Sequence, residues 1–273
     1  MTDPEFHYRE IAPPPALAPF VRCIWRLRGT SGGAAEPIIP DGCAEIVINV
    51  GDPFVRYSAT GSGEVQPARL VAGQITRALT VQPSGRIDVW GIRFHPWCAR
   101  AFLDVPAVEL RDQVVALGDA SASLDEMLST VADSCDEHVA ERRILDVLTR
   151  HASRMSVSCA TVPHLVMFAA SGSDVDSVSK LSGAAGVSTR RLQTLFRDHV
   201  GLSPKQLLRV TRFQRALRMA RTQPGLSWSR IAALTGFYDQ AHLIHDANEI
   251  AGCTPAALVR RDAPITDAFL SDV

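Results

Sequence analysis

Short apolar segments, separated by turn residues, dominate residues 1–115 of the chain. In residues 21–28 apolar positions alternate with mostly basic ones, a period of two that predicts a half-buried strand. Residues 44–50 and 87–94 are rich in β-branched and aromatic residues and predict further strands. Proline and glycine at 40–42 and 83–85 mark turns. This succession of short strands predicts a β-sandwich or barrel.

Helical spacing replaces this pattern between residues 123 and 153. Apolar residues recur there every three or four positions, first at Leu124, Leu128 and Val131 and then at Ile144 and Leu148. Two interpretations of these helices are open. They form either a linker or dimerisation surface, or a cap over the β domain.

One pattern occurs twice in the C-terminal region, in residues 181–196 and 231–243. Each copy begins with an apolar anchor and has a glycine five residues later. Glycine allows the positive φ of a tight turn, and two positions further Ser188 or Asp239 offers a side-chain oxygen to cap the next helix. Each copy therefore predicts a helix-turn-helix.

A long helix is predicted between the two copies, with Ser203 as its N-cap and Pro204 in its first turn. Arginine recurs every three residues on one side of it, at Arg209, Arg212, Arg215, Arg218 and Arg221. Two interpretations are open: a solvated basic face, or a stripe that contacts phosphate.

Charge is unevenly distributed, although the 273-residue chain has a net charge of only −1. Residues 171–261 carry 13 basic and 6 acidic side chains, whereas residues 1–170 carry 15 and 20. A basic segment on an acidic body is typical of a nucleic-acid-binding module attached to another domain. The sequence shows neither a run of about 18 apolar residues nor a signal-peptide pattern, so we expect a cytoplasmic protein without a membrane span.

Together these C-terminal features resemble the DNA-binding domain of the AraC/XylS family of bacterial transcription regulators. The matching motifs keep the family's order over about residues 165–261, at 188–196, Gly201-Leu202-Ser203-Pro204, Ile231-Ala232, Gly236-Phe237, Gln240-Ala241-His242-Leu243 and Gly252-Cys253-Thr254-Pro255. The resemblance implies that each repeat inserts its second helix into the major groove of one duplex.

By position, the resemblance implies base-edge contacts from Arg190, Gln193 and Thr194 and phosphate contacts from Arg191 and Arg197. Arginine with guanine and glutamine with adenine are sound donor–acceptor pairs. The complete set predicted to bind DNA is Ser188, Thr189, Arg190, Arg191, Gln193, Thr194, Arg197, Lys205, Arg212, Asp239, Gln240, Ala241, His242, Ile244 and His245.

The second repeat departs from the family pattern at residues 245–250. The family usually has an arginine near His245, a large aromatic residue near Ala247 and basic residues near Asn248 and Glu249. Less positive charge weakens attraction to DNA, and the small Ala247 is expected to loosen the anchorage of the helix. We therefore predict that the first repeat carries most of the sequence specificity.

The N-terminal half resembles the uncharacterised cupin-like domain found ahead of the repeats in one AraC-like subgroup, through residues 13–17, 39–49 and 91–96. This resemblance implies a β-barrel that senses a ligand or dimerises. The residues predicted to line its ligand pocket are Trp25, Asp41, Glu45, Trp90 and His95. Core packing is the alternative role for the tryptophans, as is a turn for Asp41 and a structural role for His95.

Little in the sequence suggests metal or enzyme chemistry. The six cysteines form no C-x-x-C pair and favour buried thiols, the alternative being a redox sensor that uses Cys23, Cys43 or Cys98. Residues 1–120 contain only His7 and His95, without the paired histidines of a cupin metal site. Nucleophile-elbow, phosphate-loop and dinucleotide motifs do not occur. We predict no metal site, no cofactor and no enzymatic activity.

The overall prediction is an α+β two-domain protein, in which an N-terminal cupin-like β-barrel or sandwich precedes an all-α double helix-turn-helix domain. The predicted boundaries are a sensor domain at 1–118, a helical linker or dimerisation segment at 119–164, the helix-turn-helix domain at 165–262 and an acidic tail at 263–273.

The predicted function is sequence-specific, DNA-binding transcription regulation, controlled by a small molecule in the N-terminal domain. The expected partners are double-stranded DNA, a small-molecule effector and, for an activator, RNA polymerase. Homodimerisation is permitted by the helical segment but not required, because two repeats in one chain read two grooves. The alternative is a β-barrel ligand-binding or catalytic protein whose degenerate repeats mediate protein interaction.

Overall fold

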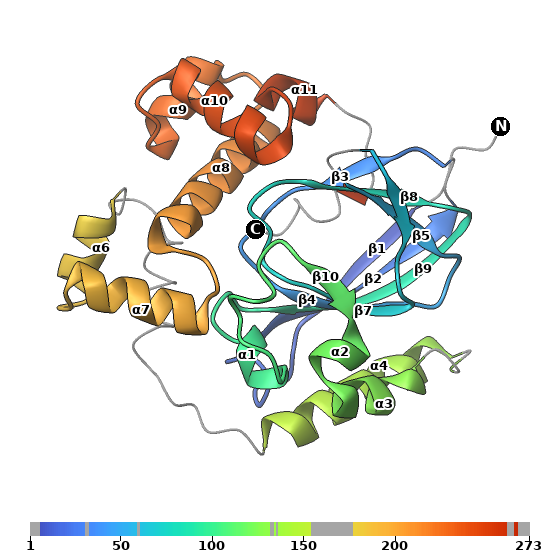
Figure 1. Cartoon of the computed structure of the whole chain (residues 1–273). Coiled ribbons are helices and arrows are strands. Elements are labelled where there is room, and N and C mark those ends of the chain that lie inside the picture. Colours follow the sequence, from blue (N-terminus) through green and yellow to red (C-terminus); the bar gives the residue numbers. More distant parts are fainter. Residues whose placement is uncertain are drawn as a thin grey trace.

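The computed structural model describes residues 6–30, 33–58, 61–131, 134, 136–153, 177–260 and 265–266. A β-sandwich with flanking helices forms its first half, and further helices beside the sandwich form the second (Figure 1). The predicted fold class, a β-rich N-terminal domain followed by an all-α double helix-turn-helix domain, is confirmed. The boundary predicted at residue 165 and the end of the predicted acidic tail lie outside the described residues.

Two antiparallel sheets form the sandwich in the described part of the chain. The larger sheet has the strand order β1 (His7–Ile11), β2 (Val21–Thr30), β9 (Arg86–Phe94), β4 (Glu45–Asn49), β7 (Arg69–Ala72) and β10 (Val114–Ala116). The smaller sheet has the order β3 (Glu36–Ile38), β8 (Leu79–Pro83), β5 (Phe54–Tyr57) and β6 (Gly63–Val65).

Four helices cover the face of the larger sheet that points away from the smaller one (Figure 1). These helices are α1 (Ala99–Phe102), α2 (Leu117–Ala120), α3 (Ala122–Ser129) and α4 (Glu137–Ala152). Leu124 and Ile144 share one core with Ile46 and Ile92 of the sheet. The helices predicted at 123–153 therefore cap the β domain, and the boundary predicted at residue 118 falls within α2.

The strand predicted for residues 21–28 is confirmed as β2, but the prediction that one of its faces is exposed is wrong, because both faces are covered around residues 24–27. Trp25 and Leu27 pack toward the smaller sheet, and Ile24 packs toward the helices. Arg26 is also buried: its guanidinium donates to Asp88 at 3.0 and 3.1 Å and lies 4.6 Å from the ring centroid of Trp90. A paired arginine therefore occupies a position that the alternation assigned to solvent.

The C-terminal domain consists of six described helices. They are α6 (Val178–Ala184), α7 (Thr189–His199), α8 (Pro204–Thr222), α9 (Trp228–Thr235), α10 (Gln240–Ala251) and α11 (Pro255–Val259). Gly186 and Gly236 adopt positive φ of 63° and 84° in the two turns. The Ser188 side chain accepts from the Arg191 N–H, and the Asp239 side chain accepts from the His242 N–H. Both predicted helix-turn-helix turns are confirmed.

The predicted start of the linking helix α8 is also confirmed. The Ser203 hydroxyl accepts from the Gln206 N–H, and the Gln206 side chain accepts from the Ser203 N–H, which forms a complete capping box. The Leu207 end of α8 joins the apolar core of the first repeat, and its Phe213 and Leu217 join the core of the second. One helix therefore carries both repeats.

The sandwich packs directly against both repeats. Ile39 of the N-terminal domain lies in the apolar core of the second repeat, and Trp97 packs against the core of the first. The Gln214 amide donates to the Pro40 carbonyl at 2.6 Å.

Hydrogen bonds to backbone carbonyls near the end of the second helix of each repeat complete this interface. The Ala78 N–H donates to the Ile250 carbonyl near the end of α10 at 2.7 Å, and Arg100 donates to the Asp198 carbonyl near the end of α7 at 3.1 Å. The N-terminal domain thus holds the carboxyl ends of α7 and α10. Among the described residues, no helix combines the length and the apolar composition needed to cross a bilayer.

Replacing Gly91 tests the close contact between β2 and β9. A Cβ at Gly91 would lie 1.9 Å from the Trp25 ring, which crosses the neighbouring strand at that register position. We expect Gly91→Ala to lower the free energy of unfolding by about 3 kcal/mol, because overpacking forces the ring to move. Gly183→Ala, which meets open space within helix α6, is the matched control and should be neutral or stabilising. Urea denaturation measures both, and equal effects would contradict the packing argument.

Candidate nucleic-acid interface

Helix α7 separates its buried and exposed residues cleanly. Leu192, Leu195 and Phe196 are buried in the core of the first repeat. The opposite side exposes Thr189, Arg190, Arg191, Gln193 and Arg197. The predicted recognition face is therefore one continuous exposed surface with hydrogen-bond donors.

The polar groups of this face differ in how free they are to meet DNA. Among the described residues, the Arg190 and Arg191 guanidinium groups have no ion-pair partner, whereas Arg197 pairs with Asp198 at 3.1 Å. Thr194 is half-buried, and its hydroxyl donates to the Arg190 carbonyl at 3.1 Å. Arg190 and Gln193 are thus better placed than Thr194 to reach base edges.

Helix α10 presents a smaller and less basic face. Gln240, Ala241 and His245 are exposed, whereas Ile244 and His242 are half-buried. The Gln240 amide oxygen already accepts from the Ser229 hydroxyl at 2.7 Å. Among the described residues, the exposed face of α10 therefore lacks the unpaired arginines found on α7.

His242 is also occupied by contacts within its own repeat. Its Nδ1 lies 3.3 Å from the Tyr238 N–H, which donates to it, and its ring meets Phe237 edge-on at 5.3 Å. These contacts give His242 a structural role at the turn that precedes α10.

Asp246 is the residue whose role the sequence analysis missed. Its side chain is only 5% exposed, and its carboxylate accepts from Arg209 at 2.8 Å and from Arg212 at 3.0 Å. Arg212 additionally lies 4.5 Å from the ring centroid of Phe237. Asp246 therefore ties α10 to α8 by two charge-assisted hydrogen bonds and supplies anchorage beside the small, fully buried Ala247. The sequence contains only the two separate parts of this signal, an acidic residue inside a predicted recognition helix and arginines that recur on α8, and it does not show that they meet.

The arginine stripe on α8 divides between the two interpretations. Arg209 and Arg212 turn toward Asp246, so Arg212 is placed in the domain interior more than on a DNA-facing surface. Arg215 is half-buried with its pKa lowered by burial, whereas Arg218 and Lys205 are exposed. Only part of the stripe is therefore a solvated basic face.

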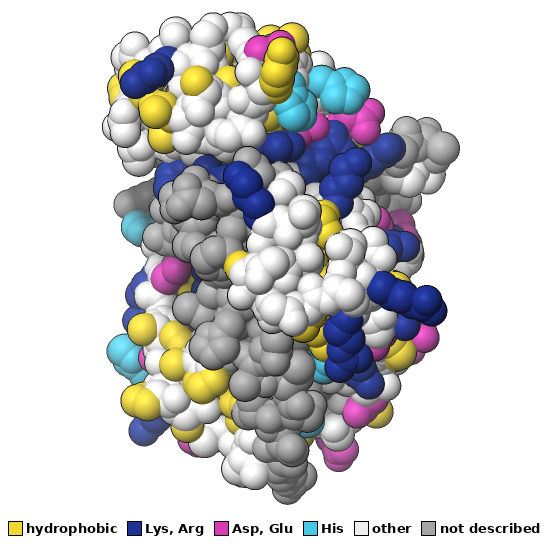
Figure 2. All heavy atoms as spheres, turned by 90° about the vertical axis from the view of Figure 1, so that its left-hand side faces the viewer, with side chains coloured by type: hydrophobic (Ala, Val, Ile, Leu, Met, Phe, Trp, Pro, Cys, Tyr) yellow, Lys and Arg dark blue, Asp and Glu magenta, His cyan; other side chains and the backbone are white. Residues whose placement is uncertain are grey.

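A groove of about 530 Å³ separates the two repeats and receives side chains from α6, α8 and α10. Its basic and titratable walls come from Lys205, Arg209, Arg212, His242 and His245, with Asp246 and Glu249 beside them. Figure 2 shows Lys and Arg side chains gathered under the uppermost lobe, next to His and acidic side chains. Positive charge is thus concentrated where the two repeats meet.

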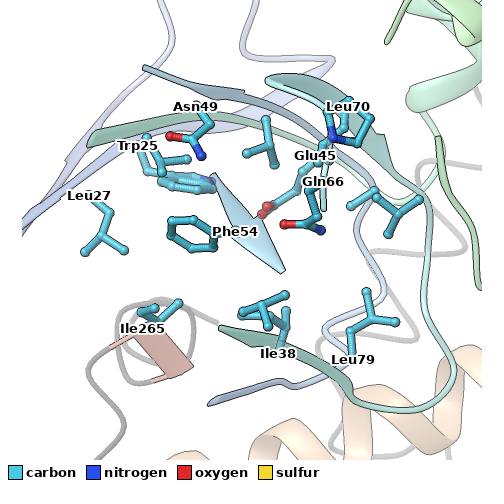
Figure 3. A pocket seen from close by; sticks show the side chains of 16 residues that line it. Trp25, Leu27, Ile38, Glu45, Asn49, Phe54, Gln66, Leu70, Leu79 and Ile265 are labelled. Atoms are coloured by element: carbon cyan, nitrogen blue, oxygen red, sulfur yellow. The ribbon is translucent and has the colours of Figure 1, made fainter. Parts of the chain in front are cut away.

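A second hollow lies between the two sheets of the sandwich and has a volume of about 90 Å³. Of the five residues predicted to line a ligand pocket, Trp25 and Glu45 line this one (Figure 3). Trp90 instead packs on the helix-covered face of the sheet. His95 stacks on Trp97 with ring centroids 4.8 Å apart, its Nε2 lies 3.1 Å from the Ala18 carbonyl oxygen, and burial lowers its pKa.

Asp41 and Glu45 belong to a buried charge cluster around Arg93. The Arg93 side chain is 1% exposed and lies 2.5 Å from Glu45, 3.5 Å from Asp41 and 3.8 Å from Glu10. Burial raises the pKa of the Glu45 carboxyl. Asp41 also accepts from the Cys43 N–H at 2.8 Å, which is the turn that its position before a glycine favours. The structure therefore brings Asp41 close to Glu45, but Asp41 itself does not line the hollow.

The described cysteines do not form a metal site or a reactive pair. Cys23, Cys43 and Cys98 are buried free thiols, and burial raises the pKa of Cys23 and of Cys98 to about 12. Such thiols stay protonated at neutral pH and are poor nucleophiles. In the described part of the chain, no group of three or more His, Cys, Asp or Glu residues is placed to hold a metal ion.

Comparison with known proteins matches both domains. Residues 181–261 match a family described as a helix-turn-helix domain, and residues 9–116 match a domain of unknown function (DUF6597). A stretch of 77 residues is 39% identical to the HTH-type transcriptional regulator GlxA of Rhizobium meliloti (strain 1021) and covers 28% of this chain and 24% of that relative. The chain thus spans about a quarter of the curated relative it matches. Among solved structures, ToxT from Vibrio cholerae O395 is 10% identical, with a TM-score of 0.48, over 93% of this chain and 96% of that one.

The fold and the exposed faces of α7 and α10 define a two-domain protein with a duplicated helix-turn-helix module behind a β-sandwich. The C-terminal domain is more particularly an AraC-type helix-turn-helix domain. The resemblance drawn from the motifs at 188–196 and 231–243 is confirmed.

Substituting Asp246 tests the anchorage of α10. We expect Asp246→Asn to lower the free energy of unfolding by about 2 kcal/mol, because it leaves two partly buried guanidinium groups without their carboxylate; their partial exposure reduces the cost below that of a fully buried pair. Glu249→Gln, on the same helix and 44% exposed, should change stability by less than about 0.5 kcal/mol. Urea denaturation followed by circular dichroism distinguishes the two. Similar effects of both substitutions would show that Asp246 does not anchor the helix.

Proposed function

We propose that this protein is a sequence-specific, DNA-binding transcription regulator. The observation that carries the proposal is the exposed face of α7, where Arg190, Arg191 and Gln193 project from an AraC-type helix-turn-helix domain. Arg190 and Gln193 read base edges in the major groove, and Arg191 and Arg197 meet phosphates. The remaining predicted contacts divide by exposure: Ser188, Thr189, Lys205, Asp239, Gln240, Ala241 and His245 are exposed, whereas Thr194, Arg212, His242 and Ile244 are half-buried.

The two repeats contribute unequally to recognition. Helix α7 supplies unpaired donors, whereas the arginines next to α10 are engaged by Asp246. The first repeat therefore carries most of the sequence specificity, and the second positions the domain on the duplex through His245 and the basic groove. Lys205 and Arg218, exposed on α8, add attraction that is independent of sequence.

Control by a small molecule follows from the contacts between the domains. A ligand between the sheets shifts strands whose loops hold Ile39, Pro40 and Ala78 against the second repeat. Such a ligand changes DNA affinity only to the extent that it binds two arrangements of the domains unequally.

The protein acts in the cytoplasm without catalysing a reaction, and an activating role would add RNA polymerase as a partner. Pairing of two copies on adjacent sites is compatible with this arrangement.

The double variant Arg190→Ala/Gln193→Ala tests the proposal. Duplexes are first selected from a random pool with the purified full-length protein, and affinity for the selected and scrambled duplexes is then titrated at several salt concentrations. We expect each lost base contact to cost about 1 to 3 kcal/mol of discrimination, so that the variant binds both duplexes almost equally. Arg142→Ala, an exposed arginine on α4, is the matched control and should keep full selectivity.

The salt dependence of the same titration separates a regulator from a protein-interaction module. The logarithm of the DNA affinity should fall linearly as the logarithm of the salt concentration rises, with a slope of about −0.9 for each phosphate neutralised. A pool without enriched sequences, together with binding that salt does not weaken, would overturn the proposed function.

His245→Arg tests whether α10 faces DNA. The substitution restores a positive charge on an exposed position of the groove, so we expect tighter binding and a salt slope steeper by about 0.9. His138→Arg adds the same charge on α4, in the N-terminal domain, and serves as the control. Equal small gains in both variants would indicate a general charge effect and place α10 away from the duplex.

A further inference from the structure

One wall of the hollow between the sheets comes from a residue that follows the helix-turn-helix domain in the sequence. Ile265, six residues beyond the end of α11, lines it together with Ile38 and Phe54 (Figure 3). The side chains of Ile265 and Thr266 are almost fully buried, at 2% and 1% exposure. The chain therefore returns from the helix-turn-helix domain to the N-terminal sandwich.

Three hydrogen bonds hold this wall in place. The Glu36 carboxylate accepts from the N–H groups of Ile265 and Thr266 at 2.9 and 3.2 Å, and the Thr266 hydroxyl donates to the Pro37 carbonyl at 2.6 Å. The other walls are mostly strand residues fixed by pairing on both sides, such as Leu27 and Val89. Movement of Ile265 consequently breaks no strand pairing, although it disrupts these three hydrogen bonds.

The size of the hollow indicates that this wall has to move for a ligand to enter. Its volume is about 90 Å³, whereas a cavity that accepts benzene has roughly 150 Å³. The surroundings are strongly apolar, with Trp25, Leu27, Phe54 and Val81 among the lining residues. Displacement of the Ile265 side chain supplies the additional space that a ligand with a single ring needs.

Polar groups at one end of the hollow indicate the chemistry of the ligand. Glu45 and Gln66 point into the space from the larger sheet and its neighbouring loop (Figure 3). Behind Glu45, the carboxylates of Glu45, Asp41 and Glu10 surround Arg93, and Arg22 is the second cation that interacts with Asp41. Acidic side chains therefore outnumber guanidinium groups behind this end of the hollow.

The polar side chain of Asn49 also lines the hollow but is not available to bind a ligand. Its amide donates to the Asp52 carbonyl at 2.9 Å and accepts from the Gly51 N–H at 2.9 Å, so its polar groups are engaged in the turn. The acceptors that face the hollow are thus the Glu45 carboxylate, which also accepts from Arg93, and the Gln66 amide oxygen.

We propose that the hollow binds a compact apolar amine, whose ammonium group meets Glu45 and Gln66 and whose body replaces the Ile265 side chain. An ammonium at this end favours the ionised form of the buried Glu45 carboxyl, whereas a carboxylate opposes it. The assignment of this amine as the effector rests on the proposed function. Its displacement of Ile265 releases a tie between the sandwich and the helix-turn-helix domain.

Three one-ring probes of matched shape test the proposal on the full-length protein: benzylamine, benzyl alcohol and benzoate. Ligand-detected NMR titration measures their affinities in the absence of DNA. We expect benzylamine to bind at least fivefold more tightly than benzyl alcohol and benzoate to bind most weakly. Benzoate binding as tightly as benzylamine, or no binding by any probe even to the variant below, would overturn the proposal.

Ile265→Ala tests the moving wall, because it removes the side chain that the ligand must displace. We expect the affinity for benzylamine to rise about tenfold. Ile144→Ala, an equally buried isoleucine in the core on the other side of the larger sheet, is the matched control and should leave the affinity unchanged. Equal affinities in both variants would show that Ile265 does not gate the hollow.

Glu45→Gln should abolish the preference for benzylamine over benzyl alcohol; a retained preference would overturn the role of Glu45. Circular dichroism checks that this variant folds, and if it does not, the probe series with Ile265→Ala decides the question alone.

Amine binding without selective DNA binding would contradict the proposed function only. Selective DNA binding without amine binding would contradict the assignment of the pocket only.

Discussion

Helix α8 is the constraint on which the arrangement of the C-terminal domain depends. Its first turns complete the apolar core of the first repeat, and its later turns complete that of the second. Because a 19-residue helix with a full capping box is stiff along its length, the separation and relative rotation of α7 and α10 follow from it. Gln214 in its middle also binds the sandwich, so the same helix relates both repeats to the N-terminal domain.

Arginine serves two opposed purposes in this chain. Arg26 and Arg93 are buried and paired within the N-terminal domain, and Arg212 is paired and stacked between the repeats. Planar guanidinium groups suit such sites because they bind carboxylates with two donors and stack on rings. Every arginine used in this way is withdrawn from the surface that attracts nucleic acid. This loss of surface positive charge is greatest in the second repeat, where Asp246 stabilises α10 by pairing with Arg209 and Arg212.

Local signals in the sequence predicted the helical domain well. The turns at Gly186 and Gly236, with Ser188 and Asp239 as caps, depend on residues within one or two turns of each other, and the structure contains them as predicted. The role of Asp246 was not predictable in this way. Its partners lie 34 and 37 positions earlier in the chain, and only the packing of α10 on α8 brings them together.

Long-range pairing also explains the errors in the sandwich. Period two predicts which residues of a strand share a face, but not what covers each face. Trp25 is opposite Gly91 and Arg26 is opposite Trp90, so Trp25 and Trp90 lie on different faces of the same sheet. The hollow therefore contains Trp25 and Glu45 without Trp90. The burial of the second face of β2, at Ile24 and Arg26, likewise depends on α3 and α4, which lie about a hundred residues later in the chain.

The bond from the Ala78 N–H to the Ile250 carbonyl makes the sandwich a C-terminal cap for the second recognition helix. The last carbonyls of a helix lack partners within it, and here another domain supplies one donor. The helix-turn-helix domain is for this reason not a fully interchangeable part. A chimera that grafts it onto a different sensor inherits the recognition residues but loses this cap, unless the new sensor presents an N–H at the same place.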